Sequence, residues 1–242
     1  SNKINPNLYF SMGITAENVA KKYNIERHAQ QDFAITSHQK AYEAQLKGNF
    51  DNEITTINNC SKDGGIRPKS NHQILDSLNL IFDLSGTVTA ATSSPLTDGA
   101  AITLICEEQY AKDNKLDILG RIVSTAIQGC PSELMGLGPI GATQKALKRA
   151  GMTMADIELA EFNEAFAAQA LSCIKQLGWI DSYEDKVNLN GGAIALGHPL
   201  GCSGSRISTT LINLMEANDK SIGLATMCIG LGQGIATVFE RV

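Results

Sequence analysis

The feature that most constrains this chain is an alternation of strand and helix patterns that follows a polar boundary at residues 113–115. The expected strands cover residues 118–125, 187–189, 222–227 and 235–239, and the expected helices cover residues 142–150, 164–177 and 205–215. Such alternation predicts an α/β fold in which helices cover a mixed sheet. A glycine-rich turn joins the last two strands, so they should pair as an antiparallel hairpin.

The first half of the chain has a different pattern. Thr15 is expected to cap a helix that ends near Lys22, and residues 26–46 are expected to form a longer helix with a stripe of small residues. Residues 49–79 are polar and rich in Gly, Asn and Ser, which predicts an irregular excursion of the kind that often forms lids or binding loops. Residues 100–106 are apolar and predict another strand.

Composition excludes several classes of protein. Hydrophobic residues make up 43% and charged residues 19% of the 242 positions, which is typical of a globular protein and not of a disordered chain. Twenty Lys and Arg against 25 Asp and Glu give a net charge of −5, so no nucleic-acid partner is expected. The sequence shows neither a leader peptide nor an apolar run of about 18 residues, so we expect a cytoplasmic protein without membrane insertion.

The cysteines and three of the four histidines predict no special chemistry. The six cysteines form no CxxC pair, so we expect reduced thiols, most of them packed as small apolar residues, and no metal site. His28, His38 and His72 stand in polar surroundings and are expected on the surface. The cysteines are Cys60, Cys106, Cys130, Cys173, Cys202 and Cys228.

The fourth histidine, His198, lies in a loop with five glycines between residues 188 and 204. A loop histidine is more often a hydrogen-bonded structural residue than a catalytic one. Here the glycines allow close approach of a ligand, and Pro199 restricts the backbone of His198 toward extended conformations. The pattern therefore favours a functional His198.

A second glycine-rich stretch, residues 227–234, follows a predicted strand and contains Cys228. Backbone N–H groups in such a loop can stabilise an oxyanion. A buried thiol before a hairpin turn is an equally good reading of this segment alone. A phosphate-binding loop fits poorly, because neither stretch has the Gly-Lys-Ser/Thr ending.

A third stretch begins with Asn163 at a predicted strand-to-helix junction. An asparagine there is more often a helix N-cap, but it can also fix a water beside a reacting carbonyl. Cys173 falls on the core face of the helix that follows and is expected to be structural. Cys202 lies in the His198 loop, where packing is a commoner role than catalysis.

These motifs, in this order, resemble those of thiolases. Asn163-Glu-Ala-Phe, Gly197-His-Pro-Leu-Gly and Cys228-Ile-Gly-Leu-Gly-Gln-Gly are similar to the family's three C-terminal motifs. Ser11-Met-Gly-Ile-Thr-Ala-Glu-Asn and Gly86-Thr-Val-Thr-Ala are similar to its lid region and the strand that leaves it. Within the family, the sequence most resembles the bacterial 3-ketoacyl-CoA thiolases of fatty-acid oxidation.

The resemblance implies a domain organisation. A thiolase has two similar core domains, with a lid inserted in the first. Residues 1–97 would form the lid region, residues 98–115 the last strand and exit of the N-terminal core, and residues 116–242 the C-terminal core, which is one half of the duplicated core. The nucleophilic cysteine belongs to the first core domain, most of which this sequence lacks, and no cysteine here holds an equivalent position. The sequence departs from the family pattern at residues 60–65, residues 79–82 and Pro95. These positions lie in or beside the lid, so the departures bear on the acyl chain length of the substrate and on the CoA contacts more than on the catalytic steps.

The resemblance also implies roles for individual residues. His198 would activate the nucleophile, and Cys228 would be the acid/base thiol that protonates the leaving enolate and then helps deprotonate CoA. Asn163 would hold the water of one oxyanion hole, and the N–H of Gly230 would serve a second. The residues expected at CoA are Ser94, Met12, Phe82, Phe166 and Arg67, of which Arg67 lies beside residues 60–65, a stretch that is shorter here than in the β-oxidation thiolase.

Several functions follow as expectations. The first is the C-terminal part of a 3-ketoacyl-CoA thiolase of β-oxidation, inactive when isolated because the nucleophile is missing. The alternatives are an acetyl-CoA acetyltransferase that forms acetoacetyl-CoA, and an inactive CoA-binding or assembly fragment. CoA would be a substrate, with no permanently bound cofactor. We also expect an exposed apolar face, and as partners a second copy, an N-terminal thiolase half or the larger subunit of the β-oxidation complex.

Overall fold

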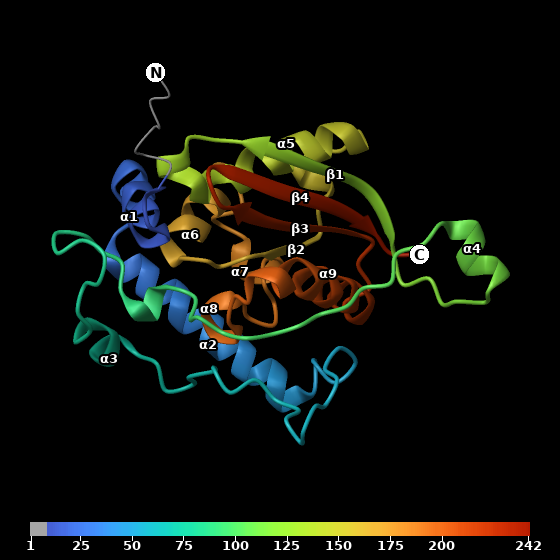
Figure 1. The fold of residues 1–242 in the computed structure, drawn as a ribbon, viewed down its shortest axis with the longest axis horizontal. Coiled ribbons are helices and arrows are strands. Elements are labelled where there is room, and N and C mark those ends of the chain that lie inside the picture. The colour runs from blue at the N-terminus through green and yellow to red at the C-terminus, as the bar shows by residue number, and fades with distance from the viewer. Residues whose placement is uncertain (1–8) are drawn as a thin grey trace.

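A four-stranded mixed sheet forms the centre of residues 9–242, the part of the chain that this computed structural model describes (Figure 1). The strand order is β1-β4-β3-β2, with β1 (Arg121–Gly129), β2 (Leu159–Phe162), β3 (Ile222–Ile229) and β4 (Gln233–Glu240). β4 pairs antiparallel with both β1 and β3, whereas β2 pairs parallel with β3. The predicted α/β fold and the C-terminal hairpin are confirmed. The sequence analysis missed β2, and its predicted strand at residues 187–189 is only a single bridge from Val187 to Ala160.

Helices cover both faces of the sheet. On one face, α5 (Gly138–Ala150) and α6 (Ala167–Gln176) enclose the larger apolar core, which includes Phe162 and Leu224. On the other face, α9 (Leu200–Ala217) packs its apolar stripe against β2 and β3 through Leu211 and Met215. All three helices overlap the predicted ranges closely. The small residues of β3 and the start of α5 allow these layers to approach one another.

Two helices from the first half of the chain lie beside α6. The helix α2 (Arg27–Lys47) agrees with the prediction and buries the expected stripe, including Phe33 and Ala41. The helix α1 (Met12–Tyr23) begins earlier than predicted, because Ser11 and not Thr15 is its N-cap. Ser11 Oγ accepts from the N–H of Ile14, whereas Thr15 lies inside the helix and donates its hydroxyl to Met12 O at 2.7 Å.

Residues 48–107 form a long irregular excursion, of which the sequence predicts residues 49–79. Within it lie only short helical pieces, α3 (His72–Asp76) and η2 (Ala90–Thr92). The predicted lid region begins at residue 1, and its residues 1–8 lie outside the described part of the chain. The predicted strand at residues 100–106 does not form, and Ile102 is 94% exposed. A strand requires a hydrogen-bonded neighbour, and no β-strand of residues 9–242 pairs with this segment.

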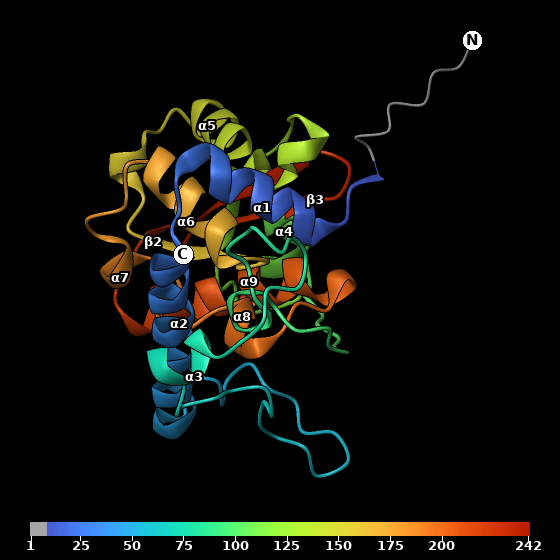
Figure 2. The ribbon, with the colours of Figure 1, turned by 90° about the vertical axis from the view of Figure 1, so that its left-hand side faces the viewer.

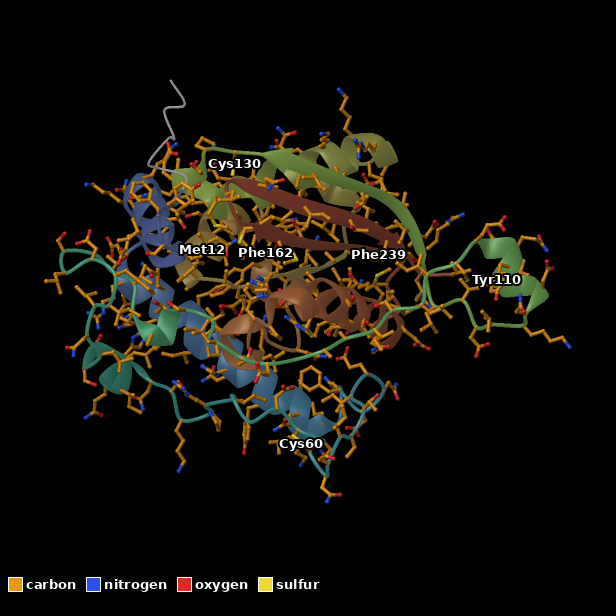
Figure 3. The ribbon with its side chains drawn as sticks, in the orientation of Figure 1. Met12, Cys60, Tyr110, Cys130, Phe162 and Phe239 are labelled. Atoms are coloured by element: carbon orange, nitrogen blue, oxygen red, sulfur yellow. The ribbon has the colours of Figure 1, made fainter. Side chains whose placement is uncertain are left out.

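The chain then reaches α4 (Glu108–Asp113), which projects away from the sheet and carries Tyr110 (Figures 1 and 3). Nothing in this arrangement tests the predicted domain boundaries at residues 97 and 115, which stay predictions. In residues 9–242, no helix combines the length and the apolar character needed to cross a bilayer. The remaining short elements are η3 (Ser132–Leu137), η4 (Met154–Asp156), α7 (Tyr183–Lys186) and α8 (Ala193–Leu196).

Candidate active site

Asn163 and His198, which lie far apart in the sequence, meet at the carboxyl end of β2. The backbone N–H of Asn163 donates to Thr226 O at 3.0 Å and so continues the parallel pairing of β2 with β3. The N-cap of α6 is Phe166, so the prediction of Asn163 as a simple cap is wrong. Its side-chain amide instead points to the histidine, with Asn163 Nδ2 at 3.3 Å from His198 Nε2.

The hydrogen bonds around His198 define its tautomer. Ser203 donates its hydroxyl to Pro199 O at 3.1 Å, and therefore accepts a hydrogen bond from His198 Nδ1 at 2.6 Å. This arrangement leaves the Nε2 lone pair of His198 facing the amide N–H of Asn163. Burial, and then the charge of Arg206, lower the pKa of His198, so the neutral imidazole is favoured. His198 therefore presents an unprotonated nitrogen that can accept a proton.

Glycine lets the chain place His198 here. Gly197 ends α8 with a φ of 93°, in the left-handed region that favours glycine. A Cβ at Gly197 would also lie 2.4 Å from Thr97 Oγ1, which belongs to the long excursion. The glycine density that singled out this loop in the sequence thus corresponds to close packing between two segments.

Cys228 lies near the end of β3, on the strand next to β2. The register pairs Phe162 with Thr226, so Cys228 is only two residues beyond the position that faces the end of β2. Its side chain is buried and packs with Met135, Ala165 and Phe166. Burial raises the pKa of the Cys228 thiol to about 12, so the sulfur carries its proton at neutral pH.

Gly230 lies two residues after Cys228, in the exposed turn between β3 and β4. The turn needs positive φ at Leu231 (66°) and Gly232 (91°). A Cβ at Gly232 would lie 2.4 Å from Cys130 O, so the turn also packs against the chain that leaves β1. This tight packing fixes the backbone beside Gly230.

Behind Asn163, a buried carboxylate organises the loop that carries His198. Glu164 accepts hydrogen bonds from Asn188 Nδ2 at 2.7 Å and from the N–H of Ile194 at 3.2 Å. It also accepts from the hydroxyl of Ser37 on α2 at 2.7 Å. Burial raises the pKa of Glu164, and these donors oppose that shift. The sequence analysis missed this role of Glu164, although the residue follows Asn163 directly.

A second buried carboxylate lies under the site. Glu161, on β2, accepts a hydrogen bond from Arg206 Nη1 at 3.4 Å. Burial raises the pKa of Glu161 to about 8, and Arg206 opposes that shift. The roles of Ser203 and Arg206 were not predicted from the sequence either. The only available signal was that both follow His198 near the start of a predicted helix.

Most of the residues predicted at CoA lie around Phe166. The rings of Phe82 and Phe166 meet edge to face with centroids 6.0 Å apart. Phe82 also covers Gly13, where a Cβ would lie 2.1 Å from the ring, and Met12 precedes that glycine. The N–H of Ser94 donates to Ala165 O at 3.0 Å, so Ser94 lies beside the residue that precedes Phe166.

Arg67 is the exception among the predicted CoA residues. Its side chain is exposed, and its backbone N–H donates to His38 Nδ1 at 3.2 Å. No contact joins Arg67 to Phe82, Phe166 or Ser94 among the described residues, so its role stays a prediction. The same bond corrects the expectation for His38, which is 6% exposed and not a surface residue, because the excursion folds over α2.

All six cysteines are free. Cys173 is fully buried and its S–H donates to Gly136 O at 3.3 Å, as expected for a structural thiol. Cys202 is buried as well, whereas Cys60 and Cys106 are exposed. Figure 3 shows Cys60 and Cys130 at opposite edges of the molecule.

Comparisons with known proteins show which family this chain belongs to. Residues 7–109 match the thiolase N-terminal domain, and residues 116–241 match the thiolase C-terminal domain. The 3-ketoacyl-CoA thiolase of Pseudoalteromonas atlantica is 63% identical, over 96% of this chain and 62% of that protein. The 3-ketoacyl-CoA thiolase of Shewanella loihica is 57% identical, over 95% of this chain and 62% of that protein. This chain therefore spans about three fifths of the length of these relatives.

Solved structures show the same fold. The crystal structure of the Bacillus anthracis acetyl-CoA acetyltransferase matches 96% of this chain and 60% of its own, with a TM-score of 0.90 and 36% identity. The human mitochondrial 3-ketoacyl-CoA thiolase matches 96% of this chain and 60% of its own, with a TM-score of 0.89 and 37% identity. The expected thiolase-like arrangement of sheet and helices is confirmed. From its two domain matches and its relatives, the chain belongs to the thiolase family.

Proposed function

We propose that this chain is the C-terminal part of a 3-ketoacyl-CoA thiolase, which cleaves a 3-ketoacyl-CoA with CoA into acyl-CoA and acetyl-CoA. The observation that carries the proposal is the chain of hydrogen bonds from Ser203 through His198 to Asn163 at the end of β2, with the buried thiol of Cys228 on the neighbouring strand β3. The relatives that are 57% and 63% identical to this chain are 3-ketoacyl-CoA thiolases, which favours this activity over that of an acetyl-CoA acetyltransferase.

In this proposal, His198 is the base that activates the nucleophile. A free thiol has a pKa of about 8.5, so a neighbouring base is needed to make the thiolate at neutral pH. The bond from His198 Nδ1 to Ser203 leaves Nε2 as the proton acceptor. Once protonated, the imidazolium donates to the thioester oxygen of the substrate. Ser203 is a positioning residue, because it acts only through the ring of His198.

Cys228 is the acid in the step that breaks the carbon–carbon bond. The thiolate attacks the 3-keto carbon, the bond between C2 and C3 breaks, and the electron pair remains on the leaving enolate. The thiol proton of Cys228 moves to C2 and gives acetyl-CoA, while the acyl group stays on the nucleophile. The Cys228 thiolate then accepts the proton of the incoming CoA thiol, which attacks the acyl-enzyme. A thiol whose pKa is raised to about 12 holds its proton until a strongly basic carbanion forms.

Two oxyanion sites complete the proposal. Asn163 holds the water of the first with its side-chain amide, and the N–H of Gly230 contributes to the second. One such donor typically contributes about 10²–10³ in turnover. CoA is bound as a substrate along Met12, Phe82, Phe166 and Ser94.

The nucleophile in this proposal comes from the part of the family's N-terminal core that these 242 residues do not include. Each of the six cysteines fits another role or lies apart from the site: Cys60 and Cys106 are exposed on the excursion, while Cys173 and Cys202 are packed in the interior. Cys130 directs its S–H to Met135 O at 3.7 Å. The exposed segment 102–106 and the uncovered part of the sheet border a hollow of about 960 Å³, which that core would cover.

The experiment measures thiolysis of acetoacetyl-CoA and of longer 3-ketoacyl-CoAs. We expect no turnover by this chain alone, and turnover when the part of the P. atlantica relative that this chain does not cover is added. In the mixture, His198→Ala or Cys228→Ser should lower kcat at least 10²-fold, whereas Cys60→Ser should leave it unchanged. Turnover by the chain alone, or full activity of both variants, would contradict the proposal.

The same assay separates the remaining alternatives. Preference for acetoacetyl-CoA alone would favour the acetyl-CoA acetyltransferase. CoA binding without turnover in any mixture would favour a CoA-binding or assembly fragment. The place in β-oxidation, the cytoplasmic location, and the larger subunit or a second copy as partner are further parts of the proposal, and they follow only from the resemblance of the motifs to those of the family.

A further inference from the structure

Two histidines and an aspartate that the thiolase chemistry does not use meet on the surface between α2 and α3. His28 and Asp32 lie one turn apart on α2, and His72 is the first residue of α3. Asp32 Oδ2 is 3.1 Å from His28 Nδ1, and Asp32 Oδ1 is 2.8 Å from His72 Nε2. One possible ligand atom from each side chain lies within 4.8 Å of the others. The two imidazole rings stack with centroids 4.1 Å apart.

A buried glutamine fixes the tautomer of His72. Gln31 is 1% exposed, and its Nε2 donates to Asp76 Oδ1 at 3.0 Å. Its oxygen must therefore accept, so His72 Nδ1, 3.1 Å away, carries a proton and donates it to Gln31 Oε1. The neutral ring then directs the lone pair of Nε2 at Asp32. Histidines that bind metals almost always donate their other ring N–H in this way.

Two acceptors that face each other at 2.8 Å need a cation between them. Either a proton on His72 Nε2 or a metal ion can meet that need. Zn²⁺ binds imidazole nitrogen at about 2.0–2.1 Å and carboxylate oxygen at about 2.0–2.2 Å, so two of its ligand atoms lie about 3.4 Å apart when the geometry is tetrahedral. The distances from Asp32 to His28 and His72, 3.1 and 2.8 Å, are slightly shorter than that spacing. The ring planes lie within 11° of parallel, so one of the two exposed rings must turn for both lone pairs to reach the same ion.

We propose that His28, Asp32 and His72 bind one Zn²⁺ ion, with water at the remaining coordination position. This set of two imidazoles and one carboxylate suits borderline cations of this class better than Mg²⁺ or Ca²⁺. The spacing of the cysteines predicted no metal site, and no local pattern joins these three residues, since they come from two segments about 40 residues apart.

The ion would hold the long excursion against α2. Figures 1 and 2 show α3 lying beside α2. Arg27 already ties the two helices, because its Nη2 donates to the carbonyl oxygens of Leu75 and Leu78 at 3.1 and 2.8 Å. A metal on the other side of this contact would anchor the start of α3, from which the chain continues to Phe82.

The test is a calorimetric titration of the full chain with Zn²⁺ at pH 7.5. Exposed thiols also bind Zn²⁺, so all proteins carry Cys60→Ser and Cys106→Ser. We expect one equivalent of Zn²⁺ to bind to this parent protein. Glu43→Gln is the control, because it removes a carboxylate elsewhere on the exposed side of α2, and it should also bind one equivalent. Asp32→Asn and His72→Gln, which alter different elements, should each weaken binding at least tenfold.

Thermal unfolding gives a second readout and verifies that each variant folds. Zn²⁺ should raise the Tm of the parent and of Glu43→Gln, and EDTA should reverse the shift, whereas Asp32→Asn should show no shift. Failure of the parent to bind one equivalent would overturn the proposal and leave a proton-bridged ion pair in its place. Unchanged affinity in both ligand variants would overturn it as well.

Discussion

The hydroxyl of Ser37 donates to Glu164 Oε2 at 2.7 Å and joins the middle of α2 to the active-site loop across 127 positions of sequence. The same hydroxyl oxygen accepts from the N–H of Gly192 at 3.1 Å. Both partners are buried, so neither can exchange this contact for water. Ser37 therefore links α2 directly to the segment behind Asn163, in addition to other contacts such as the bond from Asn49 Nδ2 to Asn190 Oδ1 at 2.9 Å.

We expect Ser37→Ala to lower the free energy of unfolding by about 2 kcal/mol, because it leaves Glu164 and the N–H of Gly192 without a buried partner. Urea unfolding measures the change. Ser70→Ala is the matched control, since its hydroxyl bonds only to the exposed carbonyl of Arg67, and it should change stability by less than about 0.5 kcal/mol. Equal effects of the two variants would contradict this account of Ser37.

His38 should make the protein less stable as the pH falls from 6.5 to about 4. Burial, and then the charge of Arg67, lower the pKa of His38 to about 4 in the folded state. The geometry agrees, because His38 Nδ1 accepts the N–H of Arg67 and must be unprotonated to do so. Between the two pKa values the unfolded chain binds a proton that the folded chain does not. Stability therefore rises with pH through this window, by up to about 3 kcal/mol.

Urea unfolding of the unmodified chain and of His38→Gln at pH 4.5 and 7.5 checks this. Glutamine offers an oxygen to the N–H of Arg67 but takes up no proton. The variant should gain stability relative to the unmodified chain as the pH falls, and the difference should be constant between pH 7.5 and 8.5. A difference that is the same at pH 4.5 and 7.5 would show that His38 does not titrate in this window.

His38 also illustrates what local sequence can and cannot predict. Its neighbours in the chain are polar, which indicated a surface position, but the excursion folds over it. The same limit explains residues 100–106, whose apolar pattern is that of a strand although this chain provides no partner strand. Thr15 and Ser11 are both good N-cap residues, and only the observed bond of Ser11 to Ile14 distinguishes them.

Other parts of the structure were predictable because one local signal dominated. The hairpin of β3 and β4 followed from two apolar runs around a glycine turn, and α2 followed from its stripe of small residues. The glycine density around His198 indicated close packing, which Gly197 and Thr97 now show. Ser203, Glu164 and Arg206 had no such signal, because their roles depend on contacts between segments far apart in the sequence.

Gly234 should tolerate no side chain. A Cβ there would lie 2.1 Å from the backbone carbon of Gly138, so β4 and the start of α5 would have to separate. We expect Gly234→Ala to lower the free energy of unfolding by about 3 kcal/mol. Gly201→Ala is the control, because no atom lies within 4 Å of its Cβ and alanine favours the helix by up to about 1 kcal/mol. Gly234→Ala should therefore lower the free energy of unfolding and Gly201→Ala should raise it. A change of the same sign in both variants would contradict the packing argument.

The exposed segment 100–106 should make the isolated chain associate. Ile102, Leu104 and Ile105 are 94%, 76% and 70% exposed, so this short segment presents three apolar side chains to the solvent. Apolar side chains grouped in this way favour contact with another protein surface over contact with water. We expect sedimentation velocity to show concentration-dependent oligomers, and the double variant Ile102→Asp/Leu104→Asp to remain monomeric. Leu84→Asp is the control, since Leu84 is 91% exposed on a separate loop and should not alter association. A monomer at every concentration tested would contradict this prediction, because these apolar side chains would then stay exposed to water.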